Sequence, residues 1–339
     1  MPARITRHVA LVALVAVALL ATACSSDAGG GPQGDQTAVP EGFNVFVASY
    51  DVSVAAAGPP RSPRRFIVGL TDAQNQPISY GKIAMRFAWL GEGSQSGNVT
   101  AEPTLSATGT FLPIPGSNPE ALVGSDKPRP TPPSEARGVY AAQVAFDRPG
   151  YWGIEVRADL DGVGMRSGTS QFEVRAKAAV PDVGQPALKT RNLVAGDVNG
   201  PRRVPASAID SRAQGGARIP DPELHRTTIA AAVAAHRPAV VVFSTPVYCV
   251  SQFCGPVTDM VADLAKKYGD RAEFIHVEIW RDFQAKRLND AAQQWLWRND
   301  TGQEPWVFVI GADGRITARF DNVATRGELE PLLERLPRR

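Results

Sequence analysis

The sequence predicts two domains, an all-β sandwich followed by an α/β domain, and three observations lead to this fold class. Apolar residues alternate with a period of two from about residue 43 to 174, as strands with one buried face do. From residue 227 onward, helix-periodic stretches alternate with continuous apolar runs, which is typical of helices packed on a sheet. Proline-rich stretches separate these regions, and a length of 339 residues suits two domains joined by linkers.

The composition excludes several classes of protein. The chain has 36 Lys and Arg against 34 Asp and Glu, which gives a formal net charge of +2. This balance leaves no basic excess to neutralise phosphates, so we expect no nucleic-acid partner. Three cysteines are too few for a small scaffold held together by disulfides.

The N-terminus has the pattern of an export signal. Arg4 and Arg7 precede an unbroken apolar run over residues 9–21, which is too short to span a bilayer but suits the core of a signal peptide. The run ends in Leu20-Ala-Thr-Ala-Cys24, which resembles a bacterial lipobox with its leucine one residue early. This resemblance implies that residues 1–23 are removed and that Cys24 carries lipid; the alternative is an ordinary signal peptide that ends near a cysteine.

The location of the protein follows from this signal. Residues 24–41, rich in Ser, Gly, Asp and Gln, are expected to form a flexible tether. No later apolar stretch is long enough for a second span. We therefore expect a lipoprotein anchored to the cell membrane through lipid, on the extracytoplasmic face.

The first domain is expected over residues 42–176, and its alternating runs predict strands at 66–70, 83–89, 140–146, 152–158 and 172–174. The segments 138–140 and 149–152 resemble the last hairpin of small bacterial immunoglobulin-like domains, which implies an immunoglobulin-like sandwich. Residues 91–137 predict a long proline-rich loop, with Phe111 to Ile114 packed on the sheet. The domain holds no Cys or His, so we expect it to bind or to act as a spacer.

The second domain is expected over residues 223–339, after a linker and entry segment at 177–222. Its residues predict the following helices and strands: helix 227–236, strand 239–243, helix 257–268, strand 274–280, helix 288–296, strands 306–310 and 316–320, and a last helix that begins with the capping box Thr325 and Glu328. One parallel βαβ unit followed by a hairpin and a helix is similar to the thioredoxin fold. The segment 183–187 also resembles the entry of redoxin-type domains.

Two cysteines lie where thioredoxin-like proteins carry their redox pair. Cys249 and Cys254 follow the first strand of this domain, and Cys254 is expected in or just before the first turn of the next helix. The partial positive charge of a helix N-terminus stabilises a thiolate, the form that attacks disulfides. The resemblance also implies that Pro305 is a cis-proline that faces the disulfide.

The pair departs from the family pattern. The family usually has two residues between its cysteines, whereas four separate Cys249 from Cys254, and Tyr248 stands where a tryptophan is usual. We expect the pair to cycle between dithiol and disulfide by exchange with thiols or disulfides of exported proteins and with a further redox partner. Cys249, the more exposed of the two, is expected to form the mixed disulfide. No cofactor and no metal is required.

Several alternatives remain open at this level. The pair could be an inert disulfide in a non-enzymatic surface binding protein. A copper metallochaperone would combine the two thiolates with His276, which we expect to be structural instead. A peroxiredoxin-like reaction would use Ser251 and Cys254, but Pro246 is one residue out of register for that motif. Glu278 is expected to be an exposed strand carboxylate and not a buried proton acceptor.

Overall fold

A computed structural model describes residues 41–54, 62–93, 102–117, 127–251, 253–298 and 302–338. The expected signal peptide, Cys24 and almost all of the expected tether lie outside these residues. Residues 39–339 belong to one compact unit, and the predicted domain boundaries stay predictions. Within the described residues, none of the helices has the length and apolar character needed to cross a bilayer.

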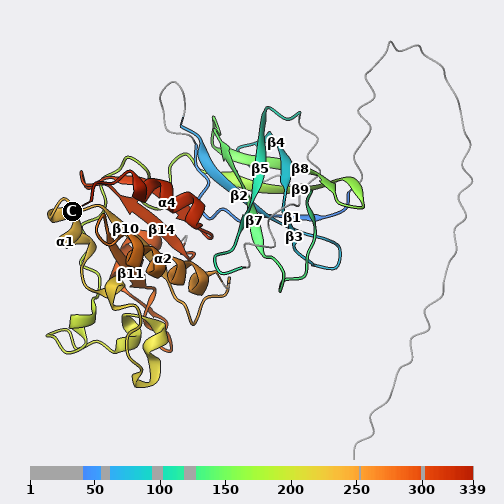
Figure 1. Ribbon diagram of the computed structural model, residues 1–339. Coiled ribbons are helices and arrows are strands. Elements are labelled where there is room, and N and C mark those ends of the chain that lie inside the picture. Colours follow the sequence, from blue (N-terminus) through green and yellow to red (C-terminus); the bar gives the residue numbers. More distant parts are fainter. Residues whose placement is uncertain are drawn as a thin grey trace, which may run out of the picture. The chain divides into compact units, whose positions relative to one another are not determined.

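Seven strands form one antiparallel sheet in the order β1-β2-β7-β5-β4-β8-β9 (Figure 1). They are β1 (Asn44–Val47), β2 (Arg64–Thr71), β4 (Lys82–Gly91), β5 (Leu105–Pro113), β7 (Gly138–Val144), β8 (Gly150–Leu160) and β9 (Gly164–Val174). The sheet curls until its edges meet: the Gly42 N–H donates to the Ser167 carbonyl at 3.0 Å, and Glu41 bridges to Ser167. A short pair, β3 (Ile78–Ser79) and β6 (Arg129–Pro130), lies beside it.

The interior of this nearly closed sheet is aromatic. Phe66, Phe87 and Phe146 are fully buried and meet edge to face, with ring centroids 5.3–5.7 Å apart. Trp152 packs against Phe146 at 5.3 Å. Burying each such side chain contributes about 1.5–3 kcal/mol, so the curl is stabilised by the apolar face that it encloses.

The predicted immunoglobulin-like sandwich is wrong. No two facing sheets form in this part of the described chain, because β5 pairs with both β4 and β7 and joins the strands into one sheet. β5 lies inside the segment predicted as a loop, and its inward positions Ala107 and Gly109 are too small to give an apolar alternation. Apolar and polar residues alternate in the same way in a sandwich and in a single curled sheet, because each has one buried face. The pattern therefore could not distinguish the two folds.

The strand pairing and the packing in this region bear on two further expectations. The predicted hairpin between segments 138–140 and 149–152 is wrong: β7 pairs with β2 and β5, whereas β8 pairs with β4 and β9. The predicted packing of Phe111 and Ile114 is confirmed, since both side chains are buried.

The C-terminal part is built on a four-stranded sheet in the order β11-β10-β14-β15. Its strands are β10 (Ala239–Ser244), β11 (Glu273–Glu278), β14 (Trp306–Ile310) and β15 (Ile316–Asp321); only β10 and β11 are parallel. The helices are α1 (Ile229–Ala234), α2 (Cys254–Tyr268), α3 (Asp290–Leu296) and α4 (Arg326–Glu334), and a short ribbon joins β12 (Trp280–Asp282) to β13 (Arg287–Leu288). Each predicted helix and strand of this region is therefore present, including the Thr325–Glu328 capping box.

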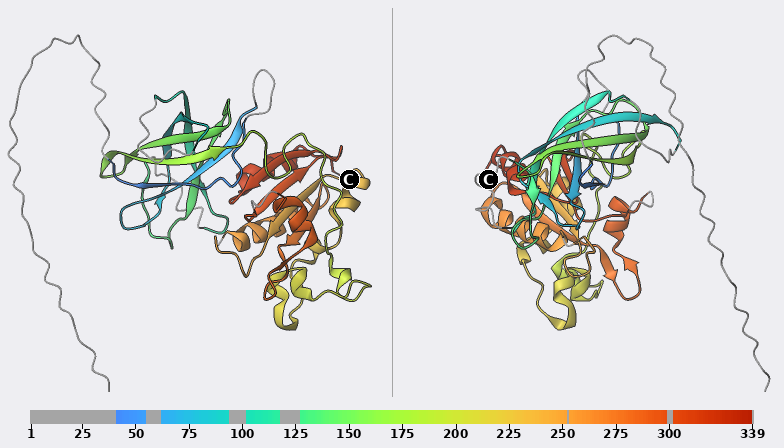
Figure 2. Two further views of the ribbon diagram at one scale, coloured as in Figure 1. Left: turned by 180° about the vertical axis from the view of Figure 1, so that it is seen from behind. Right: turned by 90° about the vertical axis from the view of Figure 1, so that its right-hand side faces the viewer.

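Strand β10 is buried on both faces, as its continuous apolar run predicts. Val241 and Phe243 pack on the side of α1 and α3, whereas Val240 and Val242 pack on the side of α2 and α4. Figure 2 shows the ribbon of this part of the chain from two further sides. The strand therefore fixes the position of the segment that follows it in the chain.

The predicted class of α/β thioredoxin-like domain is also wrong for this molecule. Most of its regular structure is β, the four-stranded sheet is mainly antiparallel, and α1 and α3 have only six and seven residues. Residues 175–228 contain only four short 3-10 turns: η2 (Ala195–Asp197), η3 (Ala206–Ala208), η4 (Ser211–Gly216) and η5 (Pro222–His225). Helix periodicity in the sequence located each helix but did not predict its length. Because the helices are short, the region has less helix than the predicted fold class requires.

Ion pairs join the two sheets within the compact unit. Arg64 on β2 makes a bidentate contact with Asp182 at 2.7 Å for both bonds. Arg65, the next residue, contacts Glu328 of α4 at 2.7 Å and Asp321 at 3.3 Å. These side chains are largely buried, so each forms a hydrogen-bonded pair in place of its lost hydration.

Candidate functional site

Cys249 and Cys254 form a disulfide at the junction between β10 and α2. Their Cα atoms are 6.0 Å apart, Cys254 is the first residue of α2, and both positions agree with the sequence-based expectation. Cys254 is fully buried, whereas Cys249 is partly exposed beside Val250, which is 96% exposed. A partner thiol can therefore approach Cys249 and cannot approach Cys254.

The N-terminus of α2 faces the disulfide without a competing cap. Phe253 stands at the N-cap and makes no side-chain hydrogen bond to the first turn, and the first turn contains no acidic residue. The N-terminal N–H groups of this 15-residue helix therefore keep their partial positive charge for a thiolate on Cys254.

Pro305 lies at the start of β14, and the Glu304–Pro305 peptide bond is cis, as expected. The register pairs Trp306 with Phe243 of β10, so Pro305 lies at the same end of the sheet as the cysteines. Its role toward a substrate stays a prediction.

Glu304 is the residue that the sequence analysis missed. A carboxylate oxygen of Glu304 and the sulfurs of Cys249 and Cys254 all lie within 4.8 Å of one another. Its Oε2 is buried and makes no hydrogen bond to any described residue. Burial, aided by the negative charge of Glu278, raises the pKa of Glu304 to about 8. The signal available in the sequence was a glutamate directly before the expected cis-proline.

Tyr50 and Ser251 complete the surroundings of the disulfide. The Tyr50 hydroxyl donates to the backbone carbonyl of Glu304 at 2.8 Å, and burial raises the pKa of Tyr50 so that it stays neutral. The Ser251 hydroxyl lies 3.2 Å from the Cys249 sulfur. Tyr50 therefore holds the segment that carries Glu304, and Ser251 offers a hydrogen bond to Cys249.

An aromatic stack lies next to Cys249 in the sequence. The ring of Tyr248 stacks on Phe283 with centroids 3.9 Å apart, and the Lys286 ammonium lies 3.7 Å from the Phe283 centroid. Tyr248 is partly exposed. Tyr248 therefore presents an aromatic surface next to the cysteine in the sequence.

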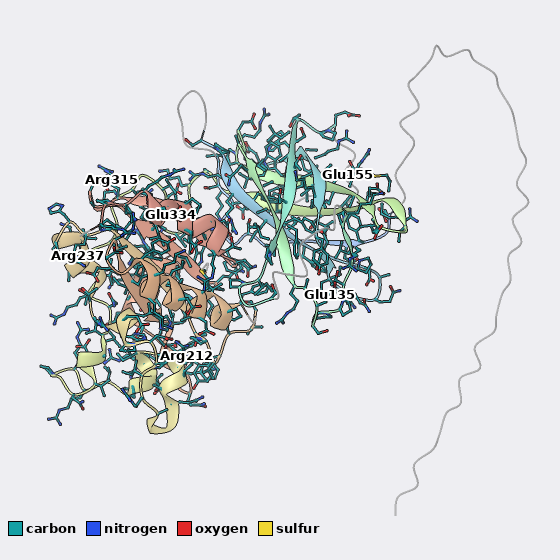
Figure 3. All side chains as sticks on the ribbon, in the orientation of Figure 1. Glu135, Glu155, Arg212, Arg237, Arg315 and Glu334 are labelled. Atoms are coloured by element: carbon teal, nitrogen blue, oxygen red, sulfur yellow. A yellow bond between two sulfur atoms is a disulfide. The ribbon has the colours of Figure 1, made fainter. Side chains whose placement is uncertain are left out.

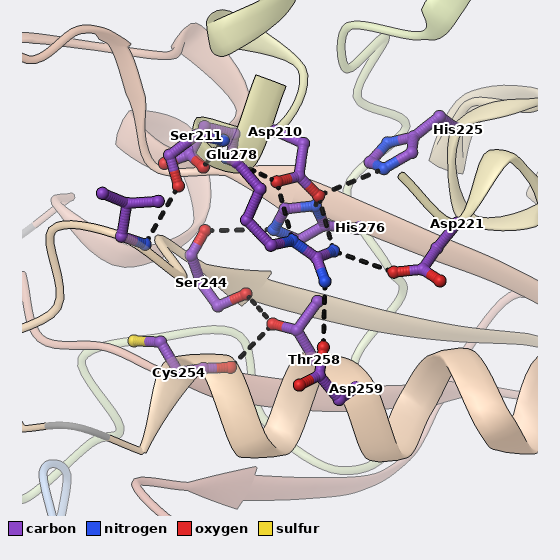
Figure 4. Close-up of polar contacts among 12 residues, drawn as sticks. Asp210, Ser211, Asp221, His225, Ser244, Cys254, Thr258, Asp259, His276 and Glu278 are labelled. Atoms are coloured by element: carbon purple, nitrogen blue, oxygen red, sulfur yellow. Dashed lines mark hydrogen bonds and ion pairs between the residues drawn. The ribbon is translucent and has the colours of Figure 1, made fainter. Parts of the chain in front are cut away.

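A second polar cluster, whose Asp210, His225 and His276 side chains are buried, lies around His276 of β11 (Figure 4). Asp210 Oδ2 is 3.5 Å from His225 Nε2 and 3.4 Å from His276 Nδ1. Arg212 makes a bidentate contact with Asp210 at 3.0 and 2.7 Å, and Figure 3 labels this arginine among the 3-10 turns. His276, which lies on β11, is thus part of a buried cluster. This position agrees with a structural role for His276.

The charges of this cluster depend on one another. Burial opposes ionisation of Asp210, but the attraction of the nearby His225, His276 and Arg212 side chains outweighs burial and lowers the pKa of Asp210 well below its usual range. Burial lowers the pKa of His225. For His276 burial acts in the same direction, but the attraction of Asp210 outweighs it and raises the pKa.

Glu278 is not the exposed carboxylate that we expected. It is 1% exposed, it accepts a hydrogen bond from the Ser211 N–H at 2.7 Å, and burial raises its pKa. The expectation failed because the 3-10 segment, which the sequence suggested was a linker, packs over the end of β11. A second hydrogen bond, from the Trp280 N–H at 3.3 Å, reaches the other carboxylate oxygen of Glu278.

Two groups of described residues have the donor atoms to hold a metal ion: Asp210 with His225 and His276, and Cys249 with Cys254 and Glu304. In the second group the sulfurs are joined to each other, so neither is a thiolate ligand in this state. The alternative copper site, which needed His276 beside the cysteines, is not among these groups in the part of the chain described.

Comparisons with protein-family models, curated proteins and solved structures found no match to this chain.

Proposed function

We propose that the protein catalyses thiol–disulfide exchange on exported proteins through Cys249 and Cys254. The observation that carries the proposal is a disulfide that joins the partly exposed Cys249 to the buried Cys254, beside Glu304, whose buried Oε2 lacks a hydrogen-bond partner among the described residues. Unequal exposure directs attack to Cys249 and makes Cys254 the leaving group.

The first step begins with a thiolate of the partner protein. It attacks the Cys249 sulfur, a mixed disulfide forms, the Cys249–Cys254 bond breaks, and its electron pair leaves on the Cys254 sulfur. Glu304, neutral below a pKa of about 8, donates a proton to this new thiolate and becomes a carboxylate.

The second step completes the exchange. A second thiol of the partner loses its proton to the Glu304 carboxylate and attacks the partner's sulfur in the mixed disulfide, which releases Cys249 as a thiolate. This thiolate takes up a proton from water, which replaces the proton that the first partner thiol lost to water when it ionised. The partner dithiol has then lost two electrons and two protons, and the Cys249–Cys254 pair has gained them. Run in reverse, Cys249 attacks a partner disulfide and Glu304 accepts the proton of Cys254.

The proposed location supports this activity. Cys24 would anchor the protein to the cell membrane through lipid, on the extracytoplasmic face, where substrates with disulfides are found. The exported thiols or disulfides and a further redox partner would meet Cys249 there. A Cys24→Ser variant should be released from membranes, whereas its cysteine pair should react unchanged.

The test is alkylation of the reduced protein as a function of pH, together with reduction of the oxidised protein by dithiothreitol. One thiol should ionise below about 8.5, the value of a free cysteine, and mild dithiol should open the disulfide. If neither happens, the pair is a structural disulfide and a non-enzymatic surface binding protein becomes the better account. A Cu(I) complex that requires His276 would instead favour a metallochaperone.

A further inference from the structure

The geometry points to a buried divalent metal site, of the kind that binds Zn²⁺, formed by Asp210, His225 and His276. Asp210 lies between η3 and η4, His225 ends η5, and His276 lies on β11 (Figure 4). One ligand atom of each residue lies within 4.8 Å of those of the other two, and all three side chains are buried. This site is separate from the cysteine pair and does not rest on its proposed function.

The first argument is the direction of the lone pair on His276. Its Nε2 lies 3.1 Å from the Ser244 carbonyl oxygen, which can only accept, so Nε2 carries the hydrogen. Nδ1 then faces Asp210 Oδ2 at 3.4 Å, and this buried atom makes no hydrogen bond to a described residue. A cation between Nδ1 and Oδ2 would satisfy both atoms.

The second argument is the number of donors around Asp210 Oδ2. The oxygen has two lone-pair directions, and Arg212 Nη2 uses one of them at 2.7 Å. Separate N–H groups of His225 and His276 cannot both use the direction that remains, and neither His225 Nδ1 nor His225 Nε2 has a hydrogen-bond partner among the described residues. One ion bound to both imidazoles and to Oδ2 satisfies all three groups together.

The third argument is distance. With zinc bonds of about 2.0–2.1 Å, ligand atoms of a tetrahedral site stand about 3.3–3.4 Å apart. The two measured contacts, 3.4 and 3.5 Å, are close to these edges and are long for hydrogen bonds to a carboxylate. Two imidazoles and one carboxylate are a donor set that suits Zn²⁺.

The surrounding charges favour a cation. Arg212 is paired with three carboxylates, those of Asp210, Asp221 and Asp259, at 2.7–2.9 Å. One guanidinium against three carboxylates leaves this cluster negative, and a divalent ion restores neutrality. The His276 Nε2–H contact with Ser244 fixes the orientation of the ring, as an outer partner of a metal ligand commonly does.

The consequence is structural. The ion would bind residues from two turns of the 3-10 segment to β11, and no helix longer than one turn holds that segment in place. Since β11 pairs with β10, the metal would also support the strand that leads to Cys249. We therefore expect metal to stabilise the fold and not to take part in the exchange chemistry.

The test uses the full chain, expressed without a histidine tag and with its disulfide intact, so that the cysteines cannot bind metal. Mass spectrometry of the metal content should find about one equivalent of zinc per chain. His225→Gln and His276→Gln should lose it. His236→Gln is the matched control because its ring is exposed and lies outside the cluster, and it should keep the metal.

A second measurement on the unaltered protein covers the case in which the variants do not fold. Protein grown with Co²⁺ should show the visible absorption of a tetrahedral ion with nitrogen and oxygen ligands and without a sulfur charge-transfer band. Protein grown without metal should melt at a lower temperature and recover when refolded with Zn²⁺. Absence of metal from the unaltered protein, a sulfur signature, or equal metal content in a folded His276→Gln variant would overturn the proposal.

Discussion

Two polar clusters lie next to the end of β10, and they differ in access. Cys249 with Cys254 and Glu304 has one exposed sulfur, whereas Asp210 with His225 and His276 is completely buried. Ser244, the last residue of β10, contacts both sides: its hydroxyl is 2.6 Å from Thr258, which donates to the Cys254 carbonyl, and its own carbonyl contacts His276.

This difference in access to solvent determines what each cluster can do. A partially exposed disulfide can exchange with another protein, while a cluster closed to solvent can only hold what was enclosed during folding. Altering the first cluster should therefore have its main effect on reactivity, whereas altering the second should change stability and leave reactivity almost unaffected.

The largest effect is expected from the cysteines. Cys249→Ser should abolish exchange, because the remaining thiol of Cys254 is buried and out of reach of a partner. The readout is reduction or oxidation of a disulfide-containing protein substrate, with Ser106→Ala, at an exposed serine of β5, as the control. Residual exchange above a few per cent in Cys249→Ser would show that attack does not begin at Cys249.

Arg212→Met should give the largest loss of stability. It leaves Asp210 as a buried carboxylate without its bidentate partner, and breaking a buried pair in this way costs about 3–5 kcal/mol. Urea unfolding measures the loss, and the folded fraction should still exchange disulfides at the normal rate. A loss below about 1 kcal/mol would mean that Asp210 is satisfied without the arginine.

Glu304→Gln should slow exchange near neutral pH while the fold is retained, since the substitution keeps shape and removes only the titratable proton. Loss of a positioned general acid or base lowers rates by about 10²–10⁴-fold. The inflection near pH 8 in the pH–rate profile should disappear with it. Glu92→Gln, at an exposed glutamate, is the matched control; an unchanged profile in Glu304→Gln would remove Glu304 from the mechanism.

The same carboxyl group should also make stability depend on pH. Glu304 has a pKa of about 8 in the folded protein and a reference value of 4.5 when unfolded, so the folded state binds more protons between these values. Stability should fall as pH rises from about 4.5 to 8, and Glu304→Gln should flatten this decline. Thermal unfolding across that range measures it, and equal slopes for the two proteins would contradict the assigned burial.

Much of the C-terminal part could be predicted from local patterns. Continuous apolar runs located β10 and β14, helix periodicity located α2, and the spacing of the cysteines placed the pair at the strand-to-helix junction. These features depend on residues that are close in the sequence, so the sequence of one chain is enough to predict them.

The features that depend on distant residues were missed. Strand β5 has small residues on its inward face, and only its pairing with β4 and β7 reveals it. Asp210, His225 and His276 meet only because an irregular segment folds against β11, and no spacing in the sequence signals that contact. Closure of the seven-stranded sheet likewise requires its first and last strands to meet.

The central claim is that the Cys249–Cys254 disulfide is redox-active, and its reduction potential tests this most directly. The full chain would be equilibrated with glutathione redox buffers and its thiols trapped by alkylation. We predict a potential above about −300 mV, in the range of catalytic and labile disulfides. A potential below that value, where the glutathione pool cannot reduce the bond, would identify a structural disulfide and contradict the account.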